Sequence, residues 1–205
     1  MTQASDEERI KRTQRKIGVV ADGFWGPKSI AACQRYLRKL GPNPSPWPEQ
    51  SRVQDFYGRP GQAGGYTPPM IAVQLPFELL FGQIRVRKVS CHKLVAGSLL
   101  RVFERLHGVY PTEEERLEAG VLFYAGIYAP RSMRGGSSPS MHSWGIAIDL
   151  NPTANANKSP WPTQATMPIE VMECFALEGW TSAGPFWGRD AMHFQATKMP
   201  GAGGK

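Results

Sequence analysis

The chain has 205 residues, of which 41% are hydrophobic and 20% charged, and its formal net charge is +7. This composition is typical of a globular protein with one domain of ordinary size and a small appendage. No apolar run approaches the ~20 residues that a membrane-spanning helix needs, so we expect no insertion into a membrane. The charge favours an acidic partner, but the basic residues are scattered rather than gathered into a stripe, which argues against nucleic acid.

The first 16 residues contain no apolar segment of a secretory signal, so we expect synthesis in the cytoplasm. Three cysteines are present, an odd number at wide spacing with no CxxC pair. Reduced, structural thiols are the expectation for such a chain.

Residues 6–40 predict two helices around the turn VADGFWGP. Asp6 is placed to cap the first helix, and Pro27 suits the first turn of the second. In the second helix, apolar residues recur at helical spacing: Ile30, Cys33, Leu37 and Leu40. The segment DGFWGPKSIAACQRYL resembles the core of the small helical peptidoglycan-binding domain. The resemblance implies wall binding by residues 1–40, and a helical hairpin that packs on the main domain is the alternative.

Residues 41–69 are dense in proline and glycine and predict a linker or an irregular wrap. A main domain is expected over residues 70–205. Its predicted elements are strands at 71–75 and 84–89, helices at 92–107 and 112–119, a central strand at 121–128, a helix from 169 to Gly179 and a last strand at 191–197. This order predicts an α+β fold in which an antiparallel sheet is flanked by helices and preceded by a small helical segment.

Two stretches contain the candidate metal-binding and catalytic residues. SMHSWGIAIDLNP (140–152) contains His142, Gly145 and Asp149, and RDAMHF (189–194) contains Asp190 and His193. Two imidazoles and a carboxylate bind zinc well and leave a fourth position for water, which then reaches a pKa of about 7. Packed or surface histidines that bind no metal are the alternative.

The spacing makes demands on the structure. Because His142 and Asp149 are an odd number of residues apart, one regular strand would point them to opposite faces. A shared metal therefore requires His142 in the loop before the strand and a turn at Gly145. By the same reasoning Asp190 must precede the last strand, with Gly188 supplying conformational freedom.

The pattern SxHxxGxAxD followed by GW…DxMHF resembles the signature of zinc peptidases that cut D-amino-acid-containing peptides of bacterial cell walls. The matching residues are Ser140, His142, Gly145, Ala147, Asp149, Trp180, Asp190 and His193. This family includes VanY-type D-alanyl-D-alanine carboxypeptidases and the L-alanyl-D-glutamate endopeptidases of phage endolysins. The resemblance implies the fold that these enzymes share with Hedgehog proteins.

The resemblance also implies roles for individual residues. It implies that His142, Asp149 and His193 hold Zn²⁺ and that Asp190 is the general base, with the carboxylates of Glu170, Glu173 and Glu178 as alternatives. An arginine upstream of the first motif, Arg131 or Arg134, would stabilise the negative charge that develops on the substrate carbonyl. Ser140 would bind the substrate or shape its loop, and Trp144 and Trp187 would line a substrate groove or pack in the core.

The expected protein is a monomeric endopeptidase of the endolysin type that cleaves the L-alanyl-D-glutamate bond of peptidoglycan. It would leave the host cytoplasm at lysis, and its basic charge suits the anionic cell envelope. A D-alanyl-D-alanine carboxypeptidase is the alternative, distinguished by a pocket closed with a group that pairs with a terminal carboxylate. A non-catalytic wall-binding protein is a third reading.

Overall fold

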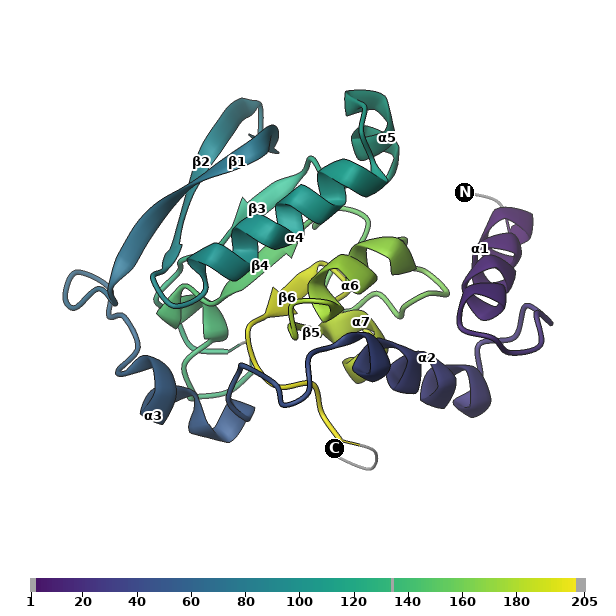
Figure 1. The fold of residues 1–205 in the computed structure, drawn as a ribbon, viewed down its shortest axis with the longest axis horizontal. Helices are drawn as coiled ribbons and strands as arrows, with labels where there is room; N and C mark the ends of the chain where they lie inside the picture. Colours follow the sequence, from purple (N-terminus) through teal and green to yellow (C-terminus); the bar gives the residue numbers. More distant parts are fainter. Residues whose placement is uncertain (1–2, 134, 202–205) are drawn as a thin grey trace.

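The computed structural model describes residues 3–133 and 135–201, which form seven α-helices and two antiparallel sheets (Figure 1). The helices are α1 (Gln3–Lys16), α2 (Pro27–Leu40), α3 (Val53–Tyr57), α4 (Ala96–Val109), α5 (Glu113–Glu118), α6 (Ile169–Ala176) and α7 (Ala183–Trp187). The strands are β1 (Met70–Phe81), β2 (Ile84–His92), β3 (Tyr124–Gly126), β4 (Ala147–Leu150), β5 (Thr181–Ser182) and β6 (His193–Gln195). Two 3-10 turns complete the set, η1 (Gln50–Arg52) and η2 (Met141–Trp144). The predicted α+β class is confirmed.

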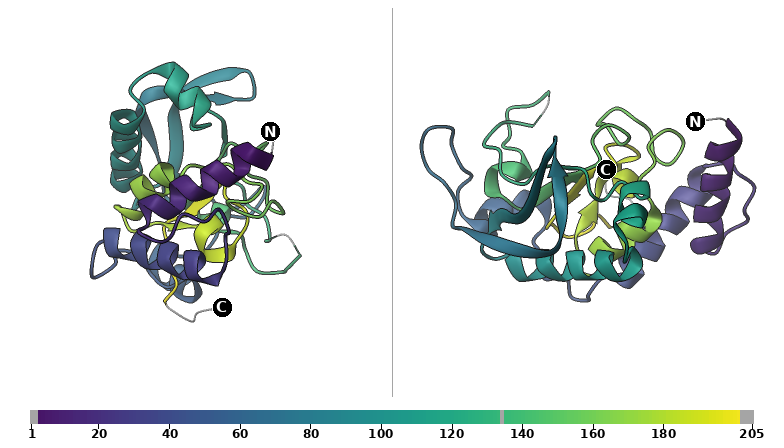
Figure 2. Two further views of the ribbon diagram at one scale, coloured as in Figure 1. Left: turned by 90° about the vertical axis from the view of Figure 1, so that its right-hand side faces the viewer. Right: turned by 90° about the horizontal axis from the view of Figure 1, so that it is seen from above.

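The central sheet has the strand order β3-β4-β6-β5, with every neighbouring pair antiparallel. Helix α4 lies along one side of this sheet, and the loops of residues 129–140 and 151–168 stand on the other (Figure 2). Helix α4 and its N-cap residue face the core with four fully buried side chains: Val95, Leu99, Val102 and Leu106. One side of the sheet is therefore packed against a helix, and the side that faces the loops is where a functional site can form.

The second sheet is the long hairpin of β1 and β2, which turns through Gly82 at a φ of 60°. Both strands extend beyond the predicted runs, and the register shifts between Gln74 and Leu79, a segment that contains Pro76. A proline cannot donate to the ladder, so a bulge is a natural place for it. The hairpin joins the central sheet through the hydrogen bond from Leu80 N to Leu122 O, 2.7 Å long.

The two N-terminal helices lie where the sequence predicts them, with differences in detail. Helix α1 begins at Gln3, so Asp6 lies in its first turn rather than at its cap. From this turn the Asp6 carboxylate pairs with Arg9 at 2.9 Å. Pro27 opens α2 as predicted. Cys33 and Leu37 are completely buried, whereas Ile30 is 37% exposed, so Ile30 was wrongly placed on the buried face.

Helices α1 and α2 dock on the rest of the chain through specific contacts. Tyr36 Oη donates to Glu173 Oε1 at 2.6 Å, and Gln34 Nε2 donates to Pro185 O at 3.0 Å. The ring of Trp25 meets the edge of Trp161 at 5.3 Å between centroids. The packed arrangement foreseen as the alternative for this segment is therefore present, and wall binding by residues 1–40 stays a prediction.

The Pro/Gly-rich stretch 41–69 is irregular apart from η1 and α3, and it wraps closely against the fold. Val53 and Tyr57 are buried in the core, and the indole of Trp47 donates to Glu178 O at 2.7 Å. Phe56, in contrast, is 45% exposed.

The predictions for the main domain need correction in several places. The strand expected at 121–128 is reduced to β3 at the sheet edge, because Val121 N still bonds back to Arg116 O in the turn that ends α5. Helix α4 starts at Ala96 rather than at residue 92, since β2 continues through His92. The elements β5 and α7 were not predicted. The capping box of Thr112 and Glu115 is confirmed by both of its hydrogen bonds.

All three cysteines are free and buried, and burial raises the pKa of each thiol to about 12: Cys33, Cys91 and Cys174. Within residues 3–133 and 135–201, no helix has both the length and the apolar character that crossing a bilayer requires.

The docking of α2 can be tested by stability. Leu37→Ala should lower the free energy of unfolding by about 2–5 kcal/mol, because it opens a cavity in the core. Ile30→Ala, on the exposed side of the same helix, should cost about 1 kcal/mol or less. Chemical denaturation of both variants measures the difference. Equal small losses would show that α2 is not part of the cooperative unit.

Candidate metal centre

The centre is built on one cross-strand pair. Asp149 in β4 lies directly opposite His193 in β6, and residues opposite each other on neighbouring strands share a face of the sheet. Asp149 Oδ1 lies 3.0 Å from His193 Nδ1. The adjacent pair, Ile148 and Phe194, points to the other face, where both side chains are completely buried. The core thus holds the register that brings carboxylate and imidazole together.

His142 reaches the same point from the turn η2. Ser140 caps this turn by accepting from His142 N, and Gly145 ends it in the left-handed conformation at a φ of 69°. The positive φ favours glycine, and a Cβ atom here would also displace the flexible end of Met70, whose Cε would lie 2.6 Å away. The turn lies where the odd spacing of His142 and Asp149 demands it.

The three candidate ligand atoms form a small triangle. His142 Nε2 lies 3.2 Å from Asp149 Oδ1 and 3.3 Å from His193 Nδ1, and the third edge is the 3.0 Å contact above. Ligands about 2.1 Å from a tetrahedral zinc lie about 3.4 Å from one another. The triangle therefore fits one face of a zinc coordination tetrahedron with little adjustment.

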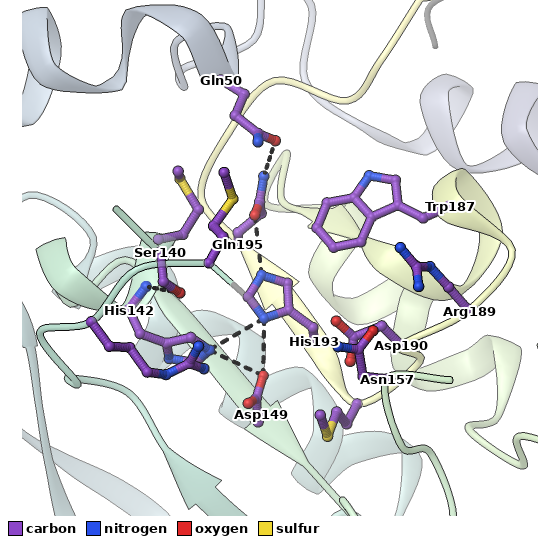
Figure 3. Close-up of a pocket in the computed structure, with 14 residues that line it drawn as sticks. Gln50, Ser140, His142, Asp149, Asn157, Trp187, Arg189, Asp190, His193 and Gln195 are labelled. Atoms are coloured by element: carbon purple, nitrogen blue, oxygen red, sulfur yellow. Dashed lines mark hydrogen bonds and ion pairs between the residues drawn. The ribbon is translucent and has the colours of Figure 1, made fainter. Parts of the chain in front are cut away.

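The second nitrogen of each imidazole contacts an oxygen outside this triangle, and Figure 3 shows the contact between His193 and Gln195. His142 Nδ1 lies 2.9 Å from the carbonyl oxygen of Ile127, and His193 Nε2 lies 3.1 Å from Oε1 of Gln195. Because a carbonyl oxygen can only accept, each of these nitrogens carries a hydrogen, and in the neutral form of the ring the nitrogen that faces the triangle is bare. Two bare nitrogens and a carboxylate oxygen thus converge on one point, an arrangement that calls for a cation.

The electrostatics of the buried residues agree with this. Burial opposes the charge of Asp149, but its hydrogen bonds with His142 and His193 outweigh burial and hold its pKa well below the usual range. Burial also opposes charge on His193, yet Asp149, with a further contribution from Asp190, raises the pKa of this imidazole. The site therefore attracts positive charge, either as a proton or as a metal ion.

The triangle lies in the wall of a cavity of about 170 Å³. Asp190 also lines this cavity, just before β6 at a φ of 59°, after Gly188 at a φ of 73°. In Figure 3 His193 lies between His142 and Asp190. The ring of Trp187 stacks on His193 with centroids 5.5 Å apart.

Two arginines line the cavity from opposite loops. Arg131 is one of the two residues expected upstream of the first motif, whereas Arg134 lies outside the described residues. Arg189 was not foreseen. In the described part of the chain, neither the Arg131 nor the Arg189 guanidinium group has a hydrogen bond or ion pair with another side chain.

The remaining predicted site residues divide between cavity and core. Ser140 lines the cavity but is buried, and its hydroxyl caps η2. Trp144 is 4% exposed and its indole donates to Gly58 O at 2.7 Å; it does not line the metal cavity but lines the larger groove beside it. The alternative bases are engaged elsewhere: Glu170 pairs with Arg12, Glu173 with Lys16 and Glu178 with Arg101.

Four polar residues of the cavity escaped sequence reasoning: Gln50, Asn157, Arg189 and Gln195. The sequence did contain a signal for Gln195. It lies two residues after His193 in the same strand, and residues two apart in a strand point to the same face. Gln50 and Asn157 had none, since they reach the cavity from irregular segments.

A larger groove of about 790 Å³ adjoins the cavity. Both share the wall residues Gln50, Met133, Met141 and Trp187. Side chains from η1, α7 and the segment after β6 complete this groove.

Comparison with known proteins gave one match. Residues 134–196 match the family model described as D-alanyl-D-alanine carboxypeptidase. No curated protein and no solved structure matched the chain. The matched segment contains His142, Asp149, Asp190 and His193, and its similarity to this family supports a zinc metallopeptidase that acts on peptidoglycan.

Proposed function

We propose that this protein is a zinc endopeptidase that cleaves the stem peptide of peptidoglycan at the L-alanyl-D-glutamate bond, as a phage endolysin released from the host cytoplasm. The observation that carries the metal chemistry is the convergence of three lone pairs from His142, Asp149 and His193. The match of residues 134–196 to peptidases of bacterial wall precursors supports the substrate class.

A zinc ion held by these three ligands supplies a polarised substrate carbonyl and a coordinated water with a pKa of about 7. Asp190 is the proposed general base, which accepts a proton from the attacking water and returns it to the leaving amine. Its support is its place in the cavity wall beside His193. Trp187 covers His193 and restricts the access of bulk water to the reacting atoms.

The two cavity arginines suit two different negative charges. We assign Arg131, from the loop before η2, to the oxyanion that develops on the scissile carbonyl. Arg189, next to the base, is assigned to a carboxylate that the substrate carries in its ground state. The D-glutamate residue of the stem peptide offers such a group beside the bond to L-alanine.

The groove favours an endopeptidase over a carboxypeptidase. A carboxypeptidase needs a pocket that ends near the scissile bond, whereas this cavity shares Trp187 and Met141 with an adjoining groove of about 790 Å³. A substrate chain can therefore extend on at least one side of the metal. A D-alanyl-D-alanine carboxypeptidase is the second candidate, favoured by the description of the matching family and by Arg189 as a partner for a terminal carboxylate.

Digestion of purified peptidoglycan followed by mass analysis of the new termini tests this function. An L-alanyl-D-glutamate endopeptidase exposes an amino-terminal D-glutamate on the released stem peptide. A carboxypeptidase instead releases free D-alanine and leaves the stem attached. Intact peptidoglycan after incubation with the zinc-loaded protein would contradict both candidates.

Metal binding and proton transfer can be separated with two variants. Asp190→Asn keeps the shape of the side chain but cannot accept a proton, so turnover should fall about a hundred- to ten-thousandfold while zinc content stays near one per chain. His193→Ala removes a ligand, and zinc content and turnover should fall together. Zinc content measured beside turnover discriminates the two roles. Loss of zinc in Asp190→Asn would identify Asp190 as a ligand instead.

The arginine assignments predict different kinetic effects. Arg189→Gln should raise KM about tenfold or more with a smaller effect on kcat, because it removes a charged hydrogen bond to the ground state. Arg131→Gln should lower kcat and kcat/KM together, because its interaction strengthens in the transition state. Arg85→Gln makes the same change in net charge on β2, where Arg85 pairs with Glu113, and should leave both constants unchanged. An effect of Arg85→Gln equal to that of Arg189→Gln would reduce the role of Arg189 to overall charge.

A further inference from the structure

The proton of His193 leads into a chain of hydrogen bonds that runs across the sheet. His193 Nε2 lies 3.1 Å from Gln195 Oε1, on the same face of β6. The amide nitrogen of Gln195 donates to Thr197 Oγ1 at 2.8 Å and to Gln50 Oε1 at 2.9 Å. Thr197 Oγ1 lies 3.4 Å from Thr181 Oγ1, on the neighbouring strand β5.

The direction of this chain is set at its far end. Thr181 Oγ1 donates its only hydrogen to the carbonyl oxygen of Thr197 at 2.9 Å, and a carbonyl can only accept. The Thr181 oxygen is therefore left to accept from the Thr197 hydroxyl. That hydroxyl in turn accepts from the amide of Gln195, which turns Gln195 Oε1 toward His193.

The orientation of one amide group thus determines whether His193 can bind a metal. With Gln195 Oε1 at His193, the ring carries its hydrogen on Nε2 and presents a bare Nδ1 to the triangle. With the amide reversed, the Gln195 nitrogen would donate to His193 Nε2. The ring hydrogen would then sit on Nδ1, between His193 and Asp149, where a metal ion must bind.

Three members of the chain are shielded from bulk solvent. Thr181, Gln195 and Thr197 are each 1% exposed. Buried polar groups must find partners within the protein, so reversal of one member forces the others to reverse or to lose a bond. Gln50, from η1 in the Pro/Gly-rich stretch, holds the second amide hydrogen of Gln195 (Figure 3).

We propose that Gln195, Thr197 and Thr181 form a positioning relay that keeps His193 in the metal-binding tautomer, with Gln50 as its anchor. The relay rests on the proposed zinc site of this chain. The proposed effect of these residues on metal binding passes through His193.

The test measures zinc affinity by competition with a chelator, so it does not depend on catalysis. Thr181→Val removes the hydroxyl but keeps the shape, and it frees the Thr197 hydrogen to turn toward Gln195. Zinc affinity should then fall about tenfold, within the range typical for partners of metal ligands. Gln195→Leu, which removes the acceptor, should cost as much or more.

Gln195→Glu supplies the rescue. A carboxylate accepts from His193 Nε2 in either orientation, so this variant should keep its zinc affinity. Thr181→Val added to Gln195→Glu should cause no further loss, because the direction of the chain no longer matters. A purely structural role of Thr181 would instead give the same loss in both backgrounds.

Thr13→Val is the matched control, since Thr13 is a buried threonine in α1 whose hydroxyl bonds to Arg9 O. It should leave zinc affinity unchanged. Wild-type affinity in Thr181→Val, or an equal loss in the Gln195→Glu background, overturns the relay. A protein that binds zinc with the expected pattern but leaves peptidoglycan intact overturns the proposed function and retains the relay. A wild-type protein without zinc affinity overturns both.

Discussion

The site depends on the register between β4 and β6. A shift of one residue would move Asp149 or His193 to the opposite face and separate the ligands. The apolar pair between them prevents this shift, because Ile148 and Phe194 are fully buried and Phe194 stacks on Phe175 with centroids 3.9 Å apart. Ordinary core packing on one side of the sheet therefore fixes the chemistry on the other. This division explains how a sheet with only short strands can hold a demanding geometry.

Much of the candidate site could be predicted because its constraints are local. The odd spacing of His142 and Asp149 requires a turn between them, and Gly145 at a φ of 69° provides it. The same reasoning placed Asp190 before the last strand, where its own positive φ of 59° makes the break. These conclusions need only the alternation of side chains along a strand and the conformational freedom of glycine. They do not need to know which segments meet in the fold.

The features that escaped prediction depend on contacts between distant segments. Gln50 lies 145 residues from its partner Gln195 and belongs to a stretch whose composition predicts no regular structure. Amino-acid composition predicts that this segment lacks helix or strand, but it does not predict which residues an irregular segment contacts. The run 121–128 has the residues of a strand, yet β3 is short because Val121 and Leu122 are buried in the turn after α5. Here tertiary packing prevailed over local β-propensity.

The charges of the cavity connect the metal to the substrate. Asp149 raises the pKa of His193, so this side of the cavity favours positive charge. A divalent cation would add to the positive charge of the two guanidinium groups that face Asp149 and Asp190. The net charge of +7 acts at longer range but is screened beyond about 8 Å at physiological ionic strength. Under the proposed function, scattered surface charge would bring the protein to an anionic envelope, and selection among peptides would depend on Arg131 and Arg189 inside the cavity.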